Sequence, residues 1–219
     1  MSQNQDYISM FFVRHGETDY NRRGIVQGSG VNSDLNDLGR QQAGAFFDRY
    51  KELSFDQLYV SELKRTHQTI EPWLGQGYEW QIEAGLNEMN WGIHEGVIPT
   101  QEQRAAFHQT IVRWQEGHLH EKVTQGESPL EAWNRALPFF ESILQDERPR
   151  RLLFCSHGRQ LRAILSQLTR AWMTQMERFK HGNTALTVLH FEKDQLKEGE
   201  PLLERLNDTS HLELLKKAK

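Results

Sequence analysis

The sequence predicts an α/β fold, a three-layer sandwich in which a mainly parallel sheet lies between helices on both faces. Three observations lead to this expectation. Short apolar runs of strand length alternate with longer segments of helical periodicity along the 219 residues. One run ends at Arg14-His15-Gly16, and another ends at Ser156-His157-Gly158. A histidine and a glycine directly after a buried strand are typical of the carboxyl edge of a sheet, where α/β proteins bind their ligands.

Six segments have the composition of strands, because aliphatic and aromatic residues dominate them and polar residues or glycine bound them. The last of the six gives the weakest signal, so we expect it at an edge of the sheet. The segments are Tyr7–Val13, Phe55–Ser61, Trp80–Glu83, Arg151–Ser156, Thr184–Phe191 and Leu202–Leu206.

Helical periodicity fills the segments between these strands. In the first helix, apolar side chains from Leu38 to Tyr50 share one face, and Asn36 or Asp37 is placed to cap it. The second helix, Glu62–Leu74, is interrupted near Pro72, because proline lacks the backbone N–H that a helix interior needs. Further helices are expected at Thr100–Trp114 and Pro129–Leu144, from Gly158 onward, and, as a short element, at Ala171–Phe179.

The segment of residues 85–128 fits this alternation worst. It is rich in tryptophan, histidine and glycine and has no strand signal. We therefore expect an insertion that folds over one edge of the sheet as a lid. Apart from this insertion, residues 1–219 are expected to form one domain, because a chain of this length can bury a sizeable core by itself.

Composition limits the classes of partner and the compartment. The formal net charge is −4, so no basic field covers the molecule to attract nucleic acid or an anionic membrane, and any anion site must be local. Cys155 is the single cysteine, which excludes an internal disulfide, and its place in a strand favours a small core residue over a reactive thiol. Residues 1–6 lack the features of a secretion signal, and no stretch approaches the length of a membrane span. A cytoplasmic protein is expected.

Two arginines follow predicted strands. Arg14 ends the first apolar run, and Arg65 lies near the expected start of a helix, whose N-terminus also attracts an anion. A guanidinium group stays charged and binds two phosphate oxygens at once. Most single arginines are solvated surface groups, but surface arginines are not expected to cluster at strand ends. We therefore expect Arg14 and Arg65 to form an anion site.

Two histidines would reach the same site. A histidine is a nucleophile when one ring nitrogen is unprotonated and the other donates to the backbone, and we expect this of His15, where Gly16 lets the backbone approach the ring. His157 would donate to the transferring phosphoryl group. Either histidine alone could equally be a turn residue. His118 and His120 flank a leucine, but no third ligand lies nearby in the sequence, so no metal site is expected.

Glu88 is the candidate for proton transfer. It follows a predicted strand and lies among apolar residues, and burial favours the protonated form of a carboxyl, which suits a general acid that protonates a leaving alkoxide. The alternative is a loop carboxylate paired with an arginine. Glu95 is a weaker candidate for the same role. Two glycine pairs lack the context of a nucleotide-binding loop and are interpreted as turns: Gly28 with Gly30, and Gly75 with Gly77.

Four motifs occur in order along the chain. They are Arg14-His15-Gly16-Glu17-Thr18 with Asn21, Gly24 and Gln27-Gly28; Ser61-x-Leu63-x-Arg65-Thr66; Leu86-x-Glu88 with Gly92 and Glu95-Gly96; and Ser156-His157-Gly158. Together they resemble the histidine phosphatase superfamily, which has the phosphoglycerate-mutase-like fold. The resemblance extends from Phe11 to about Asn183, nearly the whole chain.

The resemblance implies a phosphohistidine on the first histidine, a proton donor and a phosphate pocket, without a metal or a cofactor. The catalytic residues would be His15, Glu88 and His157, and the phosphate-binding residues would be Arg14, Arg65, Asn21, Gln27 and Gly158.

Two features bear on the branch of this family. Gln27 and the short stretch between Glu88 and His157 resemble the phosphatases more than the cofactor-dependent mutases, which carry a longer insertion there. Arg159 departs from both patterns. It could bind a second anionic group of the substrate at the rim of the pocket, or it could point to solvent.

The expected function is therefore that of a metal-independent phosphomonoester hydrolase that acts on small phosphorylated metabolites. One alternative is cofactor-dependent phosphoglycerate mutase activity. Another is a non-catalytic phosphate-binding module, which the loss of a pocket residue would favour, and none is lost. The expected partner is a small phosphorylated substrate, with neither nucleic acid nor a membrane, and a homodimer is left open.

Overall fold

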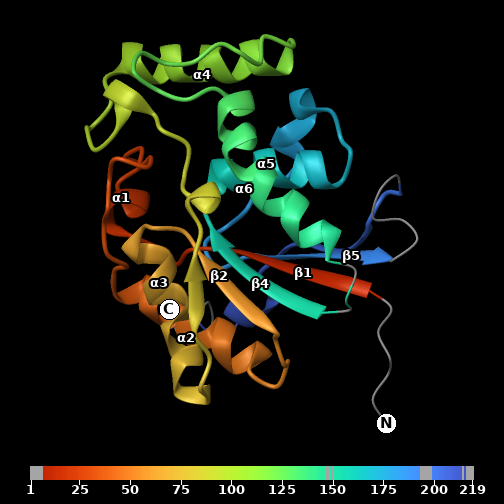
Figure 1. Cartoon of the computed structure of the whole chain (residues 1–219). Helices are drawn as coiled ribbons and strands as arrows, with labels where there is room; N and C mark the ends of the chain where they lie inside the picture. Colours follow the sequence, from red (N-terminus) through yellow and green to blue (C-terminus); the bar gives the residue numbers. More distant parts are fainter. Residues whose placement is uncertain (1–6, 147, 149, 193–198, 214, 216–219) are drawn as a thin grey trace.

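The computed structural model describes residues 7–146, 148, 150–192, 199–213 and 215. Within them a single six-stranded sheet has the strand order β3-β2-β4-β1-β5-β6 (Figure 1). The α/β class is confirmed, and so is the weak edge strand. The strands are β1 (Tyr7–Arg14), β2 (Gln57–Val60), β3 (Trp80–Ile82), β4 (Arg150–Ser156), β5 (Leu186–Glu192) and β6 (Leu202–Asp208).

The sheet is mixed, with a parallel half and an antiparallel half. The pairs β2 with β3, β2 with β4, and β1 with β4 are parallel. The pairs β1 with β5 and β5 with β6 are antiparallel. The expected parallel arrangement thus holds for the strands that precede the sequence motifs, whereas β5 and β6 pair in antiparallel fashion.

Register brings the two His-Gly steps to one point. In the parallel pair of β1 and β4, Arg14 lies opposite Ser156. The backbone N–H of His15 donates to the carbonyl oxygen of Ser156 at 3.0 Å, which continues the ladder by one residue. Since both strands run in the same direction, His15 and His157 leave the sheet at the same edge.

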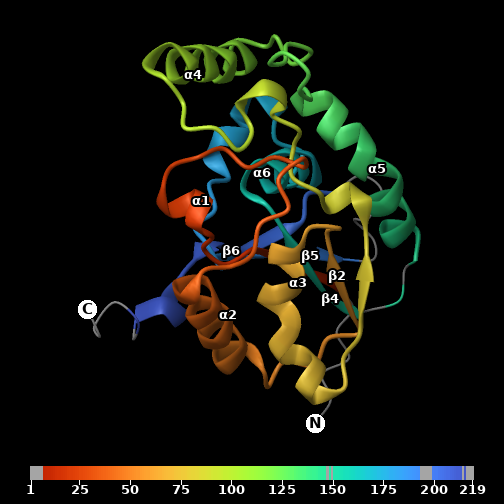
Figure 2. The same cartoon turned by 90° about the vertical axis from the view of Figure 1, so that its left-hand side faces the viewer.

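Helices cover both faces of the sheet (Figure 2). The alternation of side chains along β1 decides what each face buries. Phe11 and Val13 pack with residues of α2 and α3, whereas Met10 and Phe12 pack with residues of α5 and α6. The helices are α2 (Asp37–Tyr50), α3 (Lys64–Ile70), α5 (Pro129–Gln145) and α6 (Gly158–Leu168).

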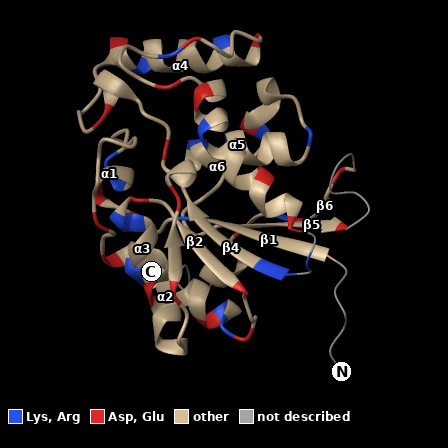
Figure 3. Cartoon of the chain, in the orientation of Figure 1, with Lys and Arg blue, Asp and Glu red and all other residues tan. Residues whose placement is uncertain are grey.

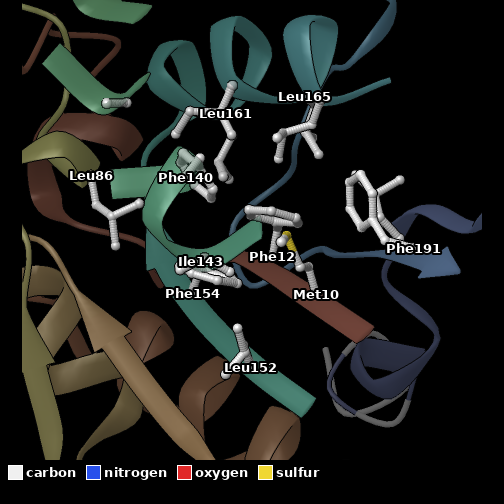
Figure 4. Close-up of a cluster of buried hydrophobic side chains, with 14 of the residues drawn as sticks. Met10, Phe12, Leu86, Phe140, Ile143, Leu152, Phe154, Leu161, Leu165 and Phe191 are labelled. Atoms are coloured by element: carbon white, nitrogen blue, oxygen red, sulfur yellow. The ribbon is translucent and has the colours of Figure 1, made fainter. Parts of the chain in front are cut away.

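The core on the α5–α6 side is dense in aromatic rings. Phe12 stacks on Phe154, with 4.9 Å between the ring centroids, and Phe154 lies 5.6 Å from Phe140. Figure 4 shows these side chains between the strands and the two helices, together with Leu161 and Leu165 of α6. This packing fixes the start of α6, and therefore His157, relative to β1.

Several predicted helices differ in length or type. The predicted Glu62–Leu74 is α3 followed by a 3₁₀ helix, η1 (Glu71–Gln76), because Pro72 ends the α-helical hydrogen bonding. The predicted Ala171–Phe179 helix is a 3₁₀ helix, η4 (Met173–Arg178). A short helix, α1 (Asp19–Arg22), was not predicted, since four residues are too few to show a period. For α2, the cap is Asn36, whose side chain accepts from Gly39 N–H.

The segment of residues 85–128 contains two 3₁₀ helices and one long helix. They are η2 (Ala84–Leu86), η3 (Gly92–His94) and α4 (Gln101–Gln115). A separate apolar cluster lies under α4, where Trp91 and Trp114 are buried with 5.7 Å between their ring centroids. Met173 and Met176 of η4 complete this cluster. The segment therefore has a small core of its own, and its action as a lid remains a prediction.

Charged residues of both signs alternate over the outer helices (Figure 3). This distribution agrees with the small formal net charge of −4. In the described part of the chain, no helix combines the length and the apolar character needed to cross a membrane.

Candidate active site

Two histidines meet at the carboxyl edge of β1 and β4. The ring centroids of His15 and His157 are 5.1 Å apart, and the rings are tilted by 53°. His15 is 3% exposed and His157 is fully buried. The convergence predicted from the two His-Gly steps is therefore present in the structure.

The His15 ring is held in one tautomer. Its Nδ1 lies 2.7 Å from the carbonyl oxygen of Gly16, and a carbonyl can only accept, so Nδ1 carries the proton and Nε2 has a free lone pair. Burial lowers the pKa of His15 well below 6.5, and the neighbouring Arg65 and Arg14 lower it further. His15 therefore presents an unprotonated Nε2, the form that a nucleophile requires.

Two arginines supply the positive charge. Arg65, the second residue of α3, is fully buried, and its guanidinium donates to Val31 O at 2.6 Å and Gly28 O at 3.3 Å. Burial lowers the pKa of Arg65 to about 10, so the group is still charged at neutral pH. Arg14 donates to His181 O at 2.9 Å.

One donor of Arg14 is available to a ligand. Its Nε is buried and makes no hydrogen bond among the described residues. A buried donor without an acceptor is unfavourable, so this N–H favours binding of an anion. Gly158 leaves room beside it, because a Cβ at that position would be only 3.4 Å from Arg14 Nε. In the structure Gly158 thus allows a close approach of backbone to the Arg14 side chain, and its predicted contact with phosphate remains a prediction.

Glu88 lies at the N-terminus of α6. Its Oε1 accepts from the N–H groups of Met89 at 3.0 Å and Gln160 at 2.9 Å, and its Oε2 accepts from Arg159 N–H at 3.2 Å. Sequence reasoning offered an arginine side chain as the alternative partner, whereas the partners are backbone donors. Oε2 accepts a single bond, so its other lone pair can carry a proton.

Asn21 and Gln27 shape the loop after β1. The Asn21 Oδ1 accepts from Thr18 N–H at 3.2 Å and from Asn183 Nδ2 at 3.3 Å. The Gln27 Nε2 donates to Thr18 Oγ1 at 2.7 Å. Asn183 also donates to His15 O at 3.0 Å, which ties this loop to the end of β1. Contacts of Asn21 and Gln27 with phosphate remain a prediction.

Arg159 does not point to solvent. Its guanidinium forms an ion pair with Glu177 of η4, which also pairs with Arg162, and it lies over the Trp91 ring at 5.9 Å from the centroid. Burial lowers the pKa of Arg159 to about 10. The solvent-facing alternative is therefore wrong, and the rim position already holds a carboxylate of the chain itself.

Glu95 has a structural contact that the sequence did not suggest. Its Oε1 accepts from Trp91 N–H at 2.8 Å, and its carboxylate lies against Gly28 and Gly30, where a Cβ at either position would overlap it. These two glycines are therefore needed for close approach as well as for a turn.

Cys155 has the structural role expected of it. Cys155 is fully buried in β4, and burial raises the pKa of its thiol, so it is a core residue. The His118 ring is 3.9 Å from Glu121, an exposed pair. No group of three or more His, Cys, Asp or Glu side chains that could hold a metal ion occurs in the described ranges.

Sequence reasoning missed several residues that position the site. Thr69 accepts from Gly16 N–H at 2.9 Å, and its hydroxyl donates to Arg65 O at 2.6 Å. Thr69 lies four residues after Arg65, on the same face of α3, and that spacing was a signal that could have found it. Ser61 is a further such residue, with its Oγ 2.8 Å from His157 Nε2.

The fold and the site define an α/β protein in which two neutral imidazoles, two charged guanidinium groups and one carboxyl meet at a sheet edge. Such a set fits a tetrahedral oxyanion such as a phosphoryl group. The chain belongs to the histidine phosphatase superfamily (branch 1), whose profile matches residues 10–209.

Relatives match over most of their length. A probable phosphoglycerate mutase GpmB of Escherichia fergusonii is 29% identical, with 94% of this chain and 95% of the relative covered. Phosphoserine phosphatase 1 of Hydrogenobacter thermophilus is 26% identical, with 94% of each covered. The chain also shares its fold with a mycobacterial glucosyl-3-phosphoglycerate phosphatase, with a TM-score of 0.79 at 22% identity over 93% of this chain and 100% of the other. An Entamoeba histolytica phosphoserine phosphatase gives a TM-score of 0.78 at 24% identity over 94% and 99%.

Proposed function

We propose that this protein is a metal-independent phosphomonoester hydrolase that acts on small phosphorylated metabolites through a phosphohistidine on His15. The observation that carries the proposal is the His15 tautomer, which leaves a free lone pair on Nε2 of a ring that lies close enough to Arg14 and Arg65 for both to lower its pKa. Relatives named as phosphoserine and glucosyl-3-phosphoglycerate phosphatases support hydrolysis of this class of ester.

In the first step, the phosphoryl group binds between Arg14, Arg65 and His157. Nε2 of His15 attacks phosphorus in line, the bond from phosphorus to the ester oxygen breaks, and the electron pair leaves with that oxygen. The two guanidinium groups stabilise the charge on the equatorial oxygens. Because these fixed cations already supply the positive charge, we propose that no metal ion is needed.

Glu88 moves the proton in both steps. It gives a proton to the departing oxygen as general acid, and then takes one from the water that attacks the phosphohistidine. That water releases inorganic phosphate and returns His15 to its neutral form. The position of Glu88 beside the start of α6, within hydrogen-bond distance of the backbone that follows His157, supports this role.

A rapid-quench experiment with labelled substrate tests the proposal. We expect acid-labile, base-stable phosphate on His15 of the wild type in excess chelator. His15→Ala should lose turnover by about 10³-fold or more, as expected when a covalent nucleophile is removed. The matched control is His118→Ala, which removes an exposed histidine that pairs with Glu121 and should retain activity. Label on His157, or activity that requires a divalent ion, would overturn the assignment.

The name of the GpmB relatives favours mutase activity as the second candidate. With 3-phosphoglycerate and trace bisphosphoglycerate, a hydrolase releases phosphate, whereas a mutase forms 2-phosphoglycerate faster than phosphate. We expect release of phosphate, because the only rim arginine that the sequence suggested for a second anion, Arg159, is paired with Glu177.

A further inference from the structure

The His157 ring is bonded at both nitrogens and buried from solvent. Arg65 Nε donates to His157 Nδ1 at 3.1 Å, and His157 Nε2 lies 2.8 Å from Ser61 Oγ. His157, Ser61 and Arg65 are all fully buried. Each proton in this group therefore has a protein partner, and its position can be worked out.

Arg65 and Ser61, one at each ring nitrogen, together set the tautomer of the imidazole. A guanidinium N–H can only donate, so His157 Nδ1 must accept and carries no proton. In a neutral ring the proton is then on Nε2, which donates to Ser61 Oγ. The structure thus contains two neutral imidazoles of opposite tautomer, with Nδ1–H in His15 and Nε2–H in His157.

The Ser61 hydroxyl is itself oriented by its neighbours. Its oxygen accepts from Leu63 N–H at 3.1 Å as well as from His157. Thr66 Oγ1 donates to Leu63 O at 2.8 Å, which uses its single proton, so Thr66 accepts from Ser61 Oγ–H at 3.0 Å. The chain of donors from His157 to Ser61 to Thr66 is complete, and Ser61 cannot donate to His157 without breaking it.

The charges around His157 oppose a second proton on the ring while the site is free. The groups that act on it are Arg65 of α3, His15 beyond β1, Arg14 of β1 and Arg135 of α5. Each is a cation or an ionisable ring, and burial acts in the same direction. Burial is the main cause that holds the pKa of His157 well below 6.5, and these groups lower it further. A phosphate dianion placed among them reverses the sign of the local field.

We propose that Ser61 is a positioning residue, which holds His157 in the Nε2–H tautomer so that Nδ1 takes up a proton from solvent when a phosphate dianion binds. The imidazolium then donates from Nδ1 to a phosphate oxygen and from Nε2 to Ser61, and Arg65 Nε–H, released from Nδ1, also faces the anion. One proton from solvent enters per dianion bound and forms the Nδ1–H bond, and no other covalent bond changes. The inference rests on the phosphatase function proposed above.

Removal of the hydroxyl changes the tautomer balance. In Ser61→Ala, Nε2–H has no acceptor, and only the Arg65 Nε–H contact still favours an unprotonated Nδ1. The Nδ1–H tautomer therefore becomes more populated than in the wild type, and once the anion draws Arg65 Nε–H away from the ring it can donate without proton uptake. Imidazole ¹⁵N NMR distinguishes these forms directly. We expect the Nε2–H form of His157 in the free wild type and a mixture in Ser61→Ala. Ser166→Ala removes another buried hydroxyl, which donates to Ala163 O at 2.8 Å, and should leave the His157 signals unchanged.

Proton uptake is measured with tungstate, a phosphate-shaped dianion that does not titrate near neutral pH. Calorimetry in two buffers of different ionisation enthalpy should give about one proton taken up per tungstate bound at pH 8, and the Kd should rise about tenfold per pH unit. In Ser61→Ala the uptake and the pH slope should fall to less than half. Ser166→Ala should match the wild type.

The outcomes separate this inference from the proposed function. An Nδ1–H tautomer in the free wild type, or tungstate binding without proton uptake, would overturn the role of Ser61, and both measurements use the unmutated protein. Hydrolysis of an aryl phosphate is assayed separately. Its absence with the expected tautomer and uptake would contradict the phosphatase proposal and leave the positioning role in place.

Discussion

Replacement of Glu88 by glutamine tests whether the same side chain both caps α6 and transfers protons. The substitution keeps the size of the group and one oxygen acceptor. It removes the negative charge and turns one acceptor into an NH₂ donor that faces backbone N–H groups. The donors that lose an acceptor are either Arg159 N–H, 3.2 Å from Oε2, or the pair Met89 and Gln160, at 3.0 and 2.9 Å from Oε1.

The substitution should lower both the stability of the fold and the turnover. Loss of a carboxylate cap at a helix N-terminus costs about 1 kcal/mol, so the melting temperature should fall by about 2–4 °C for a chain of this size. Loss of a general acid costs about 10²- to 10⁴-fold in turnover. The catalytic effect depends on the leaving group, because an alkoxide needs the proton and a nitrophenolate does not. The structural effect is the same for every substrate.

The assay compares kcat/KM of Glu88→Gln on an alkyl phosphate and on nitrophenyl phosphate, with melting temperature measured in parallel. We expect the alkyl ester to lose at least about 10²-fold more than the aryl ester. Glu83→Gln is the control, since Glu83 also caps a short helix by accepting from Gly85 N–H at 2.8 Å. An equal loss on both esters would refute the proton-transfer role and leave only the cap, with Glu95 the next carboxyl to examine.

Three further predictions use other parts of the structure. In α2, Gly39→Ala should destabilise the fold by about 1–3 kcal/mol, because the added Cβ would lie 2.1 Å from a backbone oxygen. Gly44→Ala is the control and should stabilise the fold by about 0.5–1 kcal/mol, because a Cβ there would have nothing within 4 Å. Equal denaturation midpoints for the two variants would contradict this prediction. Glu177→Gln frees Arg159 and should improve kcat/KM for acidic phosphate esters over neutral ones by about tenfold, and an unchanged ratio would remove Arg159 from the rim. Burial lowers the pKa of His181 from 6.5 to about 4, so between these pH values the unfolded state binds one more proton than the folded state. The contribution of His181 to the free energy of unfolding should be fully present above pH 6.5 and fall by about 3 kcal/mol as the pH drops to 4. In urea titrations, His181→Gln should reduce this dependence of the free energy of unfolding on pH.

The site residues that directly follow strands could be predicted from the sequence. The end of a strand fixes at which edge of the sheet the next residue lies, and this holds for His15 and for His157. The parallel pairing of β1 and β4 then places these two histidines side by side. Arg65 could be placed for the same reason. Glu88 was found because its apolar neighbours set it apart, although its backbone partners at α6 depend on how two distant segments pack.

Contacts that join distant segments could not be predicted. Arg159 and Glu177 form an ion pair across 18 positions, and no local period connects an α-helix to the 3₁₀ helix that carries Glu177. Ser61 is part of a motif, but its hydrogen bond to His157 spans 96 positions and depends on the twist of the sheet. The pairing of Glu95 with Gly28 has the same origin, since close approach leaves no signal other than the glycine itself.

The place of β1 within the sheet has a consequence for synthesis on the ribosome. Among the described strands β1 is synthesised first, yet its two neighbours, β4 and β5, begin at Arg150 and Leu186. At an elongation rate of about 5–20 residues per second, β1 waits for on the order of ten seconds or more with both of its edges unpaired. His15, the proposed nucleophile, directly follows β1, and Asn183 and His181, whose contacts hold His15 and Arg14, are synthesised later than His157. A nascent chain therefore carries His15, Glu88 and His157, the proposed catalytic residues, before it can hold them in place. Factors that bind unpaired strands have that interval in which to act.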